Sequence, residues 1–299
     1  MNCWAGRLLM GLCAGLLISV GASADDVASP IQTGHLNLVF SVTDADAVHA
    51  FYGDIIGLKR IPNIDFPGEA YMIRYMGGDS EIKFIVTGMD LPKHEGGTRN
   101  ARGIRLLALM LPQTEQAGIL ERLEAAGHDA PEFTEGKNEA AGYSYRYGMV
   151  YDGDGNQVEL VFLSEGAPEE KFKQAQLGLN VSDMAAMDTF LKDILGLRPE
   201  VTEGRIHRYG MGVSQVKFWQ GDADLPAWVG GPFDKIGMNL VQFIVPDVDA
   251  VRATVLERGG TIHTEPFPLG KLATIMFVEG PDGILFEFAG PLLERFKQK

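Results

Sequence analysis

Apolar residues fall on every second position between residues 36 and 42, with polar or smaller residues between them. This alternation predicts a half-buried strand. From residue 44 to 56 the apolar positions recur at helical spacing, and Gly57 follows as the stop signal of a helix. The pattern then returns to short apolar runs, which predict three further strands at about 58–63, 70–77 and 80–87. The first structural unit is therefore expected to be βαβββ.

The same unit recurs along the chain. Val42-Thr43-Asp44 and Val181-Ser182-Asp183 are each followed, at equal spacing, by a phenylalanine and then by D-I-[IL]-G-L. Arg74-Tyr75 and Arg208-Tyr209 each precede a glycine, a serine and a Lys-Phe pair, again at equal spacing. Such aligned identities indicate an internal duplication. Each half divides again, so that four modules are expected at 35–87, 103–163, 176–220 and 237–289.

The residues before the first module form a secretory signal. Arg7 is the first charge, an apolar run covers 8–22, and Ala22-Ser23-Ala24 supplies small residues for cleavage after Ala24. Residues 1–24 are thus expected to be removed on export to the periplasm, and the mature chain is expected to have no stable membrane span. An uncleaved anchor is the alternative interpretation. Both cysteines of the chain lie inside this signal, so the mature protein has no disulfide and no thiolate metal site.

Charge narrows the range of partners. The 299-residue chain has a formal net charge of -14 and contains no basic stripe. Such a field repels phosphate backbones, so a nucleic-acid partner is not expected. Hydrophobic residues make up 45% of the chain, which is enough to build a core in each of two domains.

Repeated βαβββ modules with V-[ST]-D before the helix and G-L after it resemble the vicinal oxygen chelate superfamily. This superfamily includes glyoxalase I, bleomycin-resistance proteins and extradiol dioxygenases. The most specific stretches are the turn and strand at 152–160, Asp-Gly-Asp-Gly-Asn-Gln-Val-Glu-Leu, and their counterpart at 280–288. The resemblance implies an α+β fold in which four modules form two glyoxalase-like domains, each with a curved mixed sheet around a cleft. It also implies that a dimer can form.

Two arrangements of the modules are compatible with this resemblance. In the simpler one, the first two modules form a domain at 33–164 and the last two form a domain at 175–292, with a charged linker between them. We take this arrangement as the prediction. The alternative is crossed pairing, because families with this fold exchange modules between domains or chains.

The resemblance also implies positions for metal ligands, usually a histidine on the first strand and a glutamate on the last strand of each module. Only Glu159 and Glu287 match the family at these positions, so the usual divalent-metal site is not expected. His35, with Glu159 or Glu287, is the weak alternative for a metal, and no other cofactor is indicated. The residues that occupy the eight positions are Asn37, Lys83, Leu106 and Glu159 in the first half, and Gln176, Lys217, Leu240 and Glu287 in the second.

The replacements suggest a specific hypothesis. Each half places a lysine and a glutamate at matched positions, and a lysine ammonium is a compact cation that can take the electrostatic place of a metal. The predicted partners are Lys83 with Glu159 and Lys217 with Glu287, each pair facing one cleft. Solvent-exposed lysines with no specific role are the alternative.

Further candidates for the cleft come from an Arg-Tyr pattern that recurs in three modules. These candidates are Arg74, Tyr147 and Arg208, and Tyr147 belongs to a row of alternating tyrosines that begins at Tyr143. Such a row can stack on a planar ligand or simply cover the sheet. No catalytic residue is assigned.

Three functional classes follow. The first is a metal-independent protein that binds a small molecule, as bleomycin-resistance proteins do. The second is a lyase, isomerase or dioxygenase of the glyoxalase type with unusual ligands. The third is an interaction module without small-molecule chemistry.

Overall fold

The computed structural model describes residue 31 and residues 35–66, 68–93, 97–139, 142–200 and 205–297. The predicted signal at 1–24 and His94 lie outside these residues. Among the described helices, none combines the length and the apolar composition needed to cross a membrane.

The first module has the predicted βαβββ order. β1 (Leu36–Val42) leads into α1 (Ala45–Val48), which continues as a wider π-helical stretch, η2 (His49–Ile55). The helix starts where it does because the Asp44 carboxylate accepts hydrogen bonds from the backbone N–H groups of Asp46 and Ala47. Three antiparallel strands follow, namely β2 (Lys59–Asp65), β3 (Tyr71–Gly77) and β4 (Ser80–Val86).

The other three modules repeat this order. The second module contains a strand at 134–138 that the sequence pattern does not predict, because its residues, Thr-Glu-Gly-Lys-Asn, are almost entirely polar. The remaining elements are β5 (Gly103–Pro112), η3 (Gln113–Glu115), α2 (Gln116–Ala125), β6 (Thr134–Asn138), β7 (Tyr143–Tyr151), β8 (Gln157–Leu163), α3 (Glu169–Phe172), β9 (Ala175–Val181), α4 (Met184–Thr189), η4 (Phe190–Ile194), β10 (Arg198–Pro199), β11 (Ile206–Met211), β12 (Ser214–Gln220), β13 (Gly237–Ile244), α5 (Val248–Glu257), β14 (Thr261–Leu269), β15 (Ala273–Glu279), η5 (Pro281–Gly283), β16 (Leu285–Gly290) and α6 (Glu294–Lys297).

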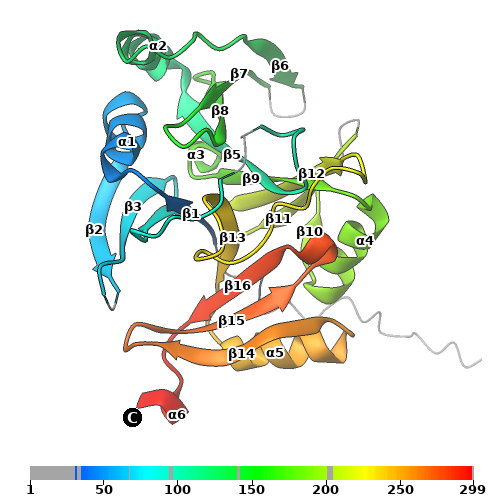
Figure 1. The fold of residues 1–299 in the computed structure, drawn as a ribbon. Helices are drawn as coiled ribbons and strands as arrows, with labels where there is room; N and C mark the ends of the chain where they lie inside the picture. The colour runs from blue at the N-terminus through cyan, green and yellow to red at the C-terminus, as the bar shows by residue number, and fades with distance from the viewer. Residues whose placement is uncertain are drawn as a thin grey trace, which may run out of the picture.

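The sixteen strands of the described residues form two eight-stranded mixed sheets. Sheet A has the order β14-β15-β16-β13-β1-β4-β3-β2, and sheet C has the order β10-β11-β12-β9-β5-β8-β7-β6. Each sheet is therefore two βαβββ modules joined through their first strands. β1 pairs antiparallel with β13, and β5 pairs antiparallel with β9. Figure 1 shows β13, from the C-terminal half, beside the blue β1 of the N-terminal half.

The predicted pairing of modules within each half is wrong, because the modules pair crosswise. The first module shares sheet A with the fourth, and the second shares sheet C with the third. The connections between elements account for this. Only residues 164–174, with α3 among them, separate β8 from β9, so β9 returns directly beside β5 in the same sheet. The longer connections at 87–102 and 221–236 carry the chain from one sheet to the other.

The main hydrophobic core runs between the two sheets and their helices as one continuous cluster. It contains buried residues from all four modules, including Phe40, Phe162, Phe218 and Phe286. Burial of aromatic side chains of this size provides the largest share of the stabilisation. The opposite faces of the sheets carry two smaller clusters, around Val39 in sheet A and around Ala108 in sheet C. We call the face with the smaller cluster the inner face of each sheet.

The repeated V-[ST]-D and Asp-Gly motifs hold the two sheets together. The Asp154 carboxylate, in the turn before β8, accepts hydrogen bonds from the backbone N–H and the hydroxyl of Thr43, at 3.2 and 2.8 Å. Asp282, in the turn before β16, accepts the same two bonds from Ser182, at 2.8 and 2.6 Å. Each motif thus caps a strand of the neighbouring sheet, which explains why both recur at fixed spacing.

Candidate functional site

A polar network crosses the inner face of sheet A. Asn37 on β1 lies opposite Gln242 on β13, and its Nδ2 donates to Gln242 Oε1 at 3.0 Å. Lys83 Nζ donates to the same oxygen at 2.5 Å. Gln242 Nε2 donates in turn to Glu287 Oε1 at 2.8 Å. The Gln242 amide therefore joins the lysine to the glutamate without a direct contact between them.

This network is buried in an apolar surrounding. Asn37 is 1% exposed, Glu287 5% and Lys83 7%. Burial lowers the pKa of Lys83 and raises the pKa of Glu287, because each charged form loses hydration. Part of that loss is offset by opposite charges: Glu81 and Glu287 favour the Lys83 cation, and Lys83 favours the Glu287 anion. The apolar neighbours on this face are Val39, Met72, Ile85 and Leu240, with Ile64, Phe66, Phe277 and Leu285 packed against them.

Glu81 and Arg74 extend the network to its edge. The Asn37 Oδ1 accepts the backbone N–H of Glu81 at 2.7 Å, and the Glu81 carboxylate lies 3.5 Å from Lys83 Nζ. Arg74 on β3 donates to the same carboxylate from Nε at 2.8 Å. Arg74, a predicted candidate, thus contacts the site through Glu81.

The inner face of sheet C has a simpler arrangement. Lys217 on β12 donates directly to the Glu159 carboxylate on β8, and both side chains are buried. Ala108 on β5 stands at the register position that Gln242 occupies in sheet A, because it lies opposite the first-strand amide of Gln176. A methyl group in place of an amide leaves nothing between the lysine and the glutamate, and the two meet.

The predicted lysine–glutamate pairs are therefore wrong in their partners. Lys83 and Glu159 lie in different sheets, as do Lys217 and Glu287. The structure brings Lys217 to Glu159, and Lys83 to Glu287 through Gln242. The reason is the crossed pairing of modules, which exchanges the last strands between the two halves.

The register adds one residue to the site that the sequence reasoning missed. Gln242 and Ala108 lie opposite the first-strand amides of Asn37 and Gln176, whereas Leu240 and Leu106 lie opposite Val39 and Gly178. A polar Gln242 within an apolar strand is the signal that could have identified it.

The inner face of sheet C also carries two predicted candidates, Arg208 and Tyr147, together with Gln215. Arg208 lies opposite Lys217 in the β11–β12 ladder, as Arg74 lies opposite Lys83. Gln215, two residues before Lys217, donates to Glu200. Tyr147 packs on the small cluster around Ala108, together with Met110, Tyr143, Tyr145, Val161, Leu163, Ala167 and Phe172.

The histidines that the structure describes do not assemble a metal site. His207 Nδ1 lies 2.8 Å from Asp188 and His49 Nδ1 lies 2.7 Å from the Tyr75 hydroxyl, and both contacts link a helix to the outer side of its sheet. His35 precedes β1, and its carbonyl accepts the backbone N–H of Ile244. Among the described residues no group of three or more His, Cys, Asp or Glu side chains could hold a metal ion.

The residues at the family's ligand positions do not fit a divalent metal as they lie. In sheet A the amide oxygen of Gln242 already accepts two donors, and one of them is the ammonium of Lys83. In sheet C the Glu159 carboxylate accepts from Lys217. A second cation at either place would be repelled by the lysine, and no imidazole is present to compete for it.

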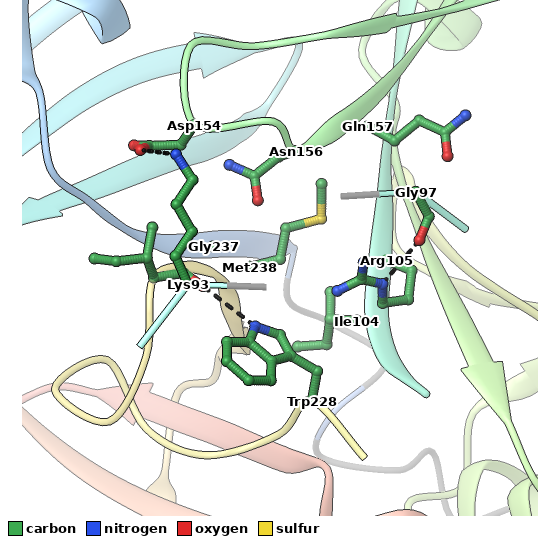
Figure 2. A pocket seen from close by; sticks show the side chains of 11 residues that line it. Lys93, Gly97, Ile104, Arg105, Asp154, Asn156, Gln157, Trp228, Gly237 and Met238 are labelled. Carbon is green, nitrogen blue, oxygen red and sulfur yellow. Dashed lines mark hydrogen bonds and ion pairs between the residues drawn. The ribbon is translucent and has the colours of Figure 1, made fainter. Parts of the chain in front are cut away.

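A separate polar pocket lies where the two sheets meet (Figure 2). Lys93 reaches across it to Asp154 at 3.0 Å, and the Arg105 Nε donates to the Gly97 carbonyl at 3.0 Å. Beside it, the buried Lys235 donates to the Met238 carbonyl at 2.6 Å and lies 5.8 Å from the centre of the Trp228 ring. Burial, followed by repulsion from Arg105, lowers the pKa of Lys235 to about 7.

Comparison with known proteins agrees with this architecture. Residues 173–288 match the model of the Glyoxalase/Bleomycin resistance protein/Dioxygenase superfamily. No curated protein sequence matches the chain. Among solved structures, glyoxalase I from Zea mays has a TM-score of 0.59 and 19% identity, and the match covers 86% of this chain and 93% of that one. The cppA protein from Streptococcus pneumoniae TIGR4 has a TM-score of 0.50 and 10% identity, with 86% and 97% covered.

At these identities the solved structures establish a common fold and leave activity open. The match to the family model covers the third and fourth modules. The first and second modules repeat the same elements and complete the same two sheets. Residues 173–288 are therefore similar to the Glyoxalase/Bleomycin resistance protein/Dioxygenase superfamily, and the described chain has the fold of glyoxalase I, with four βαβββ modules in two sheets.

Proposed function

We propose that this protein is an exported member of the superfamily that binds a small molecule at the inner faces of its sheets without the family's usual metal. The observation that carries the proposal is the contact of Lys217 with Glu159, since it puts a cation of the protein itself beside the family's glutamate. A metal at that carboxylate would have to displace the ammonium. Such a lysine supplies a hydrogen-bond donor and a positive charge, which suits polar groups of a ligand.

The burial of the network supports binding of a compact ligand. The polar groups lie among apolar side chains, and small-molecule sites usually combine an apolar lining with a few placed polar groups. Ile64 and Phe66 in sheet A, and Phe172 in sheet C, are half-buried and pack on the small clusters of these faces. The proposed ligand is expected to displace such half-buried side chains when it binds.

Two measurements on the mature protein test this proposal together. The first is the content of transition metals after purification without chelator, and the second is a thermal-shift screen with a broad set of small polar and aromatic compounds. We expect less than one tenth of a metal ion per chain and stabilisation by at least one class of compound that persists in EDTA. Stoichiometric metal, or stabilisation that EDTA abolishes, contradicts the proposal.

A glyoxalase-type lyase, isomerase or dioxygenase with unusual ligands is the second candidate. The lowered pKa of Lys83 and the raised pKa of Glu287 favour it, because groups moved in these directions by burial are suited to proton transfer. Turnover of a 2-oxoaldehyde thiol adduct or of a catechol, lost in Glu287→Gln, would support this candidate over simple binding.

A further inference from the structure

A groove open to solvent lies between the third and fourth modules. One wall is formed by α4 and η4, and the other by the turn after α5, the paired ends of β14 and β15, and the turn before β16. Its volume is about 470 Å³, within the usual range of about 300–1,000 Å³ for small-molecule sites. None of the residues in the two inner-face clusters lines it, so the groove is a separate place on the molecule.

The sequence duplication shows why this groove is open, because the corresponding space in the first half is filled. The His128 ring, just after α2, has its centre 5.7 Å from that of the Phe51 ring. The turn at Gly153 lies so close to the first helix that a Cβ there would be 2.7 Å from the Ala47 Cβ. In the second half, Gly260 stands in place of His128 and Pro281 in place of Gly153. The glycine leaves the space of the imidazole empty, and the proline ring needs room that the first half does not have.

The surface of the groove is largely apolar where its walls meet. Phe190 and Ile194 contribute from η4, Ala186 from α4 and Pro281 from the opposite turn. Ile194, Ala186 and Pro281 are half-buried, so part of each side chain is still in contact with water. A ligand with a hydrocarbon part would remove this apolar surface from water, which is favourable.

The rim of the groove carries negative charge on both walls. Asp183 precedes α4 and Glu279 ends β15, and both side chains are exposed. Asp183 accepts the backbone N–H of Ala186 with one carboxylate oxygen. Glu279 has no hydrogen-bond or ion-pair partner among the described residues. No lysine or arginine of the described chain lines the groove.

The other charges on these elements leave the negative excess in place. Each cation is matched by a carboxylate that is next to it in the sequence or forms an ion pair with it, in the pairs Lys192 with Asp193, Arg258 with Glu257, and Arg102 with Asp282. Arg258 also donates to the Ile194 carbonyl at 3.4 Å. Asp188 on α4 adds a further carboxylate, which contacts His207 and accepts from the Tyr209 hydroxyl. The charges therefore favour a cation over an anion in the groove.

We propose that this groove binds a small organic cation with an apolar body. The apolar part is expected to lie on Ile194 and Pro281, and the ammonium group beside Asp183 and Glu279. The inference goes beyond the proposed function and does not depend on it, because no inner-face residue takes part.

The test uses three probes of one shape and different charge, titrated at low salt into mature protein labelled at its alanine and isoleucine methyl groups. Naphthylmethylamine is a cation at neutral pH, naphthylmethanol is neutral and naphthoate is an anion, all substituted at the same ring position. We expect the amine to shift the NMR signals of Ala186 and Ile194, while those of Ala47 and Ile55 in the first half keep their positions. The amine should bind at least fivefold more tightly than the alcohol, and added salt should reduce this difference.

Two variants locate the contacts. Glu279→Gln removes one carboxylate and should weaken binding of the amine at least threefold, with the affinity for the alcohol unchanged. Thr189→Phe, at an exposed position that lines the groove, fills it and should abolish binding of both probes. Glu121→Gln, at an exposed position of α2, is the matched control and should leave every affinity unchanged.

Three results would overturn the inference. Equal shifts at Ala47 and at Ala186 would show contact without preference for the groove. Equal affinities of the amine and the alcohol, or equal effects of Glu279→Gln and Glu121→Gln, would exclude the proposed ligand class. Absence of binding by the amine at millimolar concentration would exclude it as well. The metal content and the EDTA comparison test the proposed function separately, so the two can fail independently.

Discussion

Lys217 donates directly to Glu159 across the inner face of sheet C, although the two residues belong to different halves of the sequence duplication. In sheet A the corresponding Lys83 reaches Glu287 only through the amide of Gln242. The duplicated sequence therefore provides two versions of one charge pair. One difference between them is the residue that lies opposite the first-strand amide, which is Ala108 in sheet C and Gln242 in sheet A.

The first prediction concerns the coupling of Lys217 and Glu159. Lys217→Met and Glu159→Gln each remove one charge of a buried ion pair. The lysine variant leaves the buried Glu159 carboxylate without its cation. We expect that variant to lose about 3–5 kcal/mol of unfolding free energy. The double variant should lose less than the sum of the two single losses, as measured by urea unfolding.

A control cycle with Lys83→Met and Glu159→Gln tests the crossed pairing at the same time. These two residues lie in different sheets, so their effects should add within about 0.5 kcal/mol. A strong interaction between Lys83 and Glu159 would mean that the modules of one half share a sheet after all.

The second prediction concerns Lys235, whose pKa is lowered to about 7 by burial. The unfolded chain keeps its proton up to about pH 10.5, whereas the folded chain releases it near pH 7. Stability contributed by this group is therefore lost as the pH falls toward 7 and is regained as the pH rises toward 10.5. Between pH 7 and 9.5 we expect a relative gain of about 3 kcal/mol in the wild type.

Lys235→Met should remove this dependence. The comparison is the difference in unfolding free energy between variant and wild type, measured at pH 7 and at pH 9.5, which cancels the titration of other groups. An equal difference at the two pH values would show that Lys235 titrates alike in the folded and unfolded chains.

The third prediction concerns the hydrogen bonds between Ser182 and Asp282, which join the two sheets. Asp282→Ala removes the acceptor for the Ser182 backbone N–H and hydroxyl, and it also removes the ion-pair partner of Arg102. We expect a loss of about 1–3 kcal/mol, because partly buried donors are left without a partner. Asp79→Ala, in the exposed β3–β4 turn, serves as the control and should change stability by less than about 0.5 kcal/mol. Equal losses in the two variants would remove the special role of Asp282.

The fourth prediction concerns export. Arg7, the apolar run that follows and Ala22-Ser23-Ala24 predict cleavage after Ala24, so the mature chain should begin at Asp25. Mass spectrometry of the protein isolated from the cell envelope measures its N-terminus directly. A full-length chain recovered from the cytoplasm would contradict the prediction, and substitution of Ala24 by a bulky residue should slow processing.

The sequence alone defined the modules and the chemistry of their key positions. The periodicity of apolar residues depends on which face of a strand or helix is buried. Each module shows this periodicity in its own sequence, whichever module it pairs with. The βαβββ order, the repeat and the matched positions of Lys83, Lys217, Glu159 and Glu287 could therefore be predicted without the structure, whereas the burial of the two lysines was left open. The polar β6 was missed because its residues lack the apolar alternation on which such predictions depend.

Only the tertiary structure decided which of these residues meet. Modules with the same order of elements have similar pairing edges, so the sequence pattern of β1 accepts either β5 or β13 as a neighbour. The short segment between β8 and β9, and the longer connections that carry the chain between the sheets, select β13. The bulges beside Val39 and Ile104 then set the register that brings Gln242 and Ala108 to the centre. Pairing and register are properties of distant strands together, and for that reason they could not be read from either strand alone.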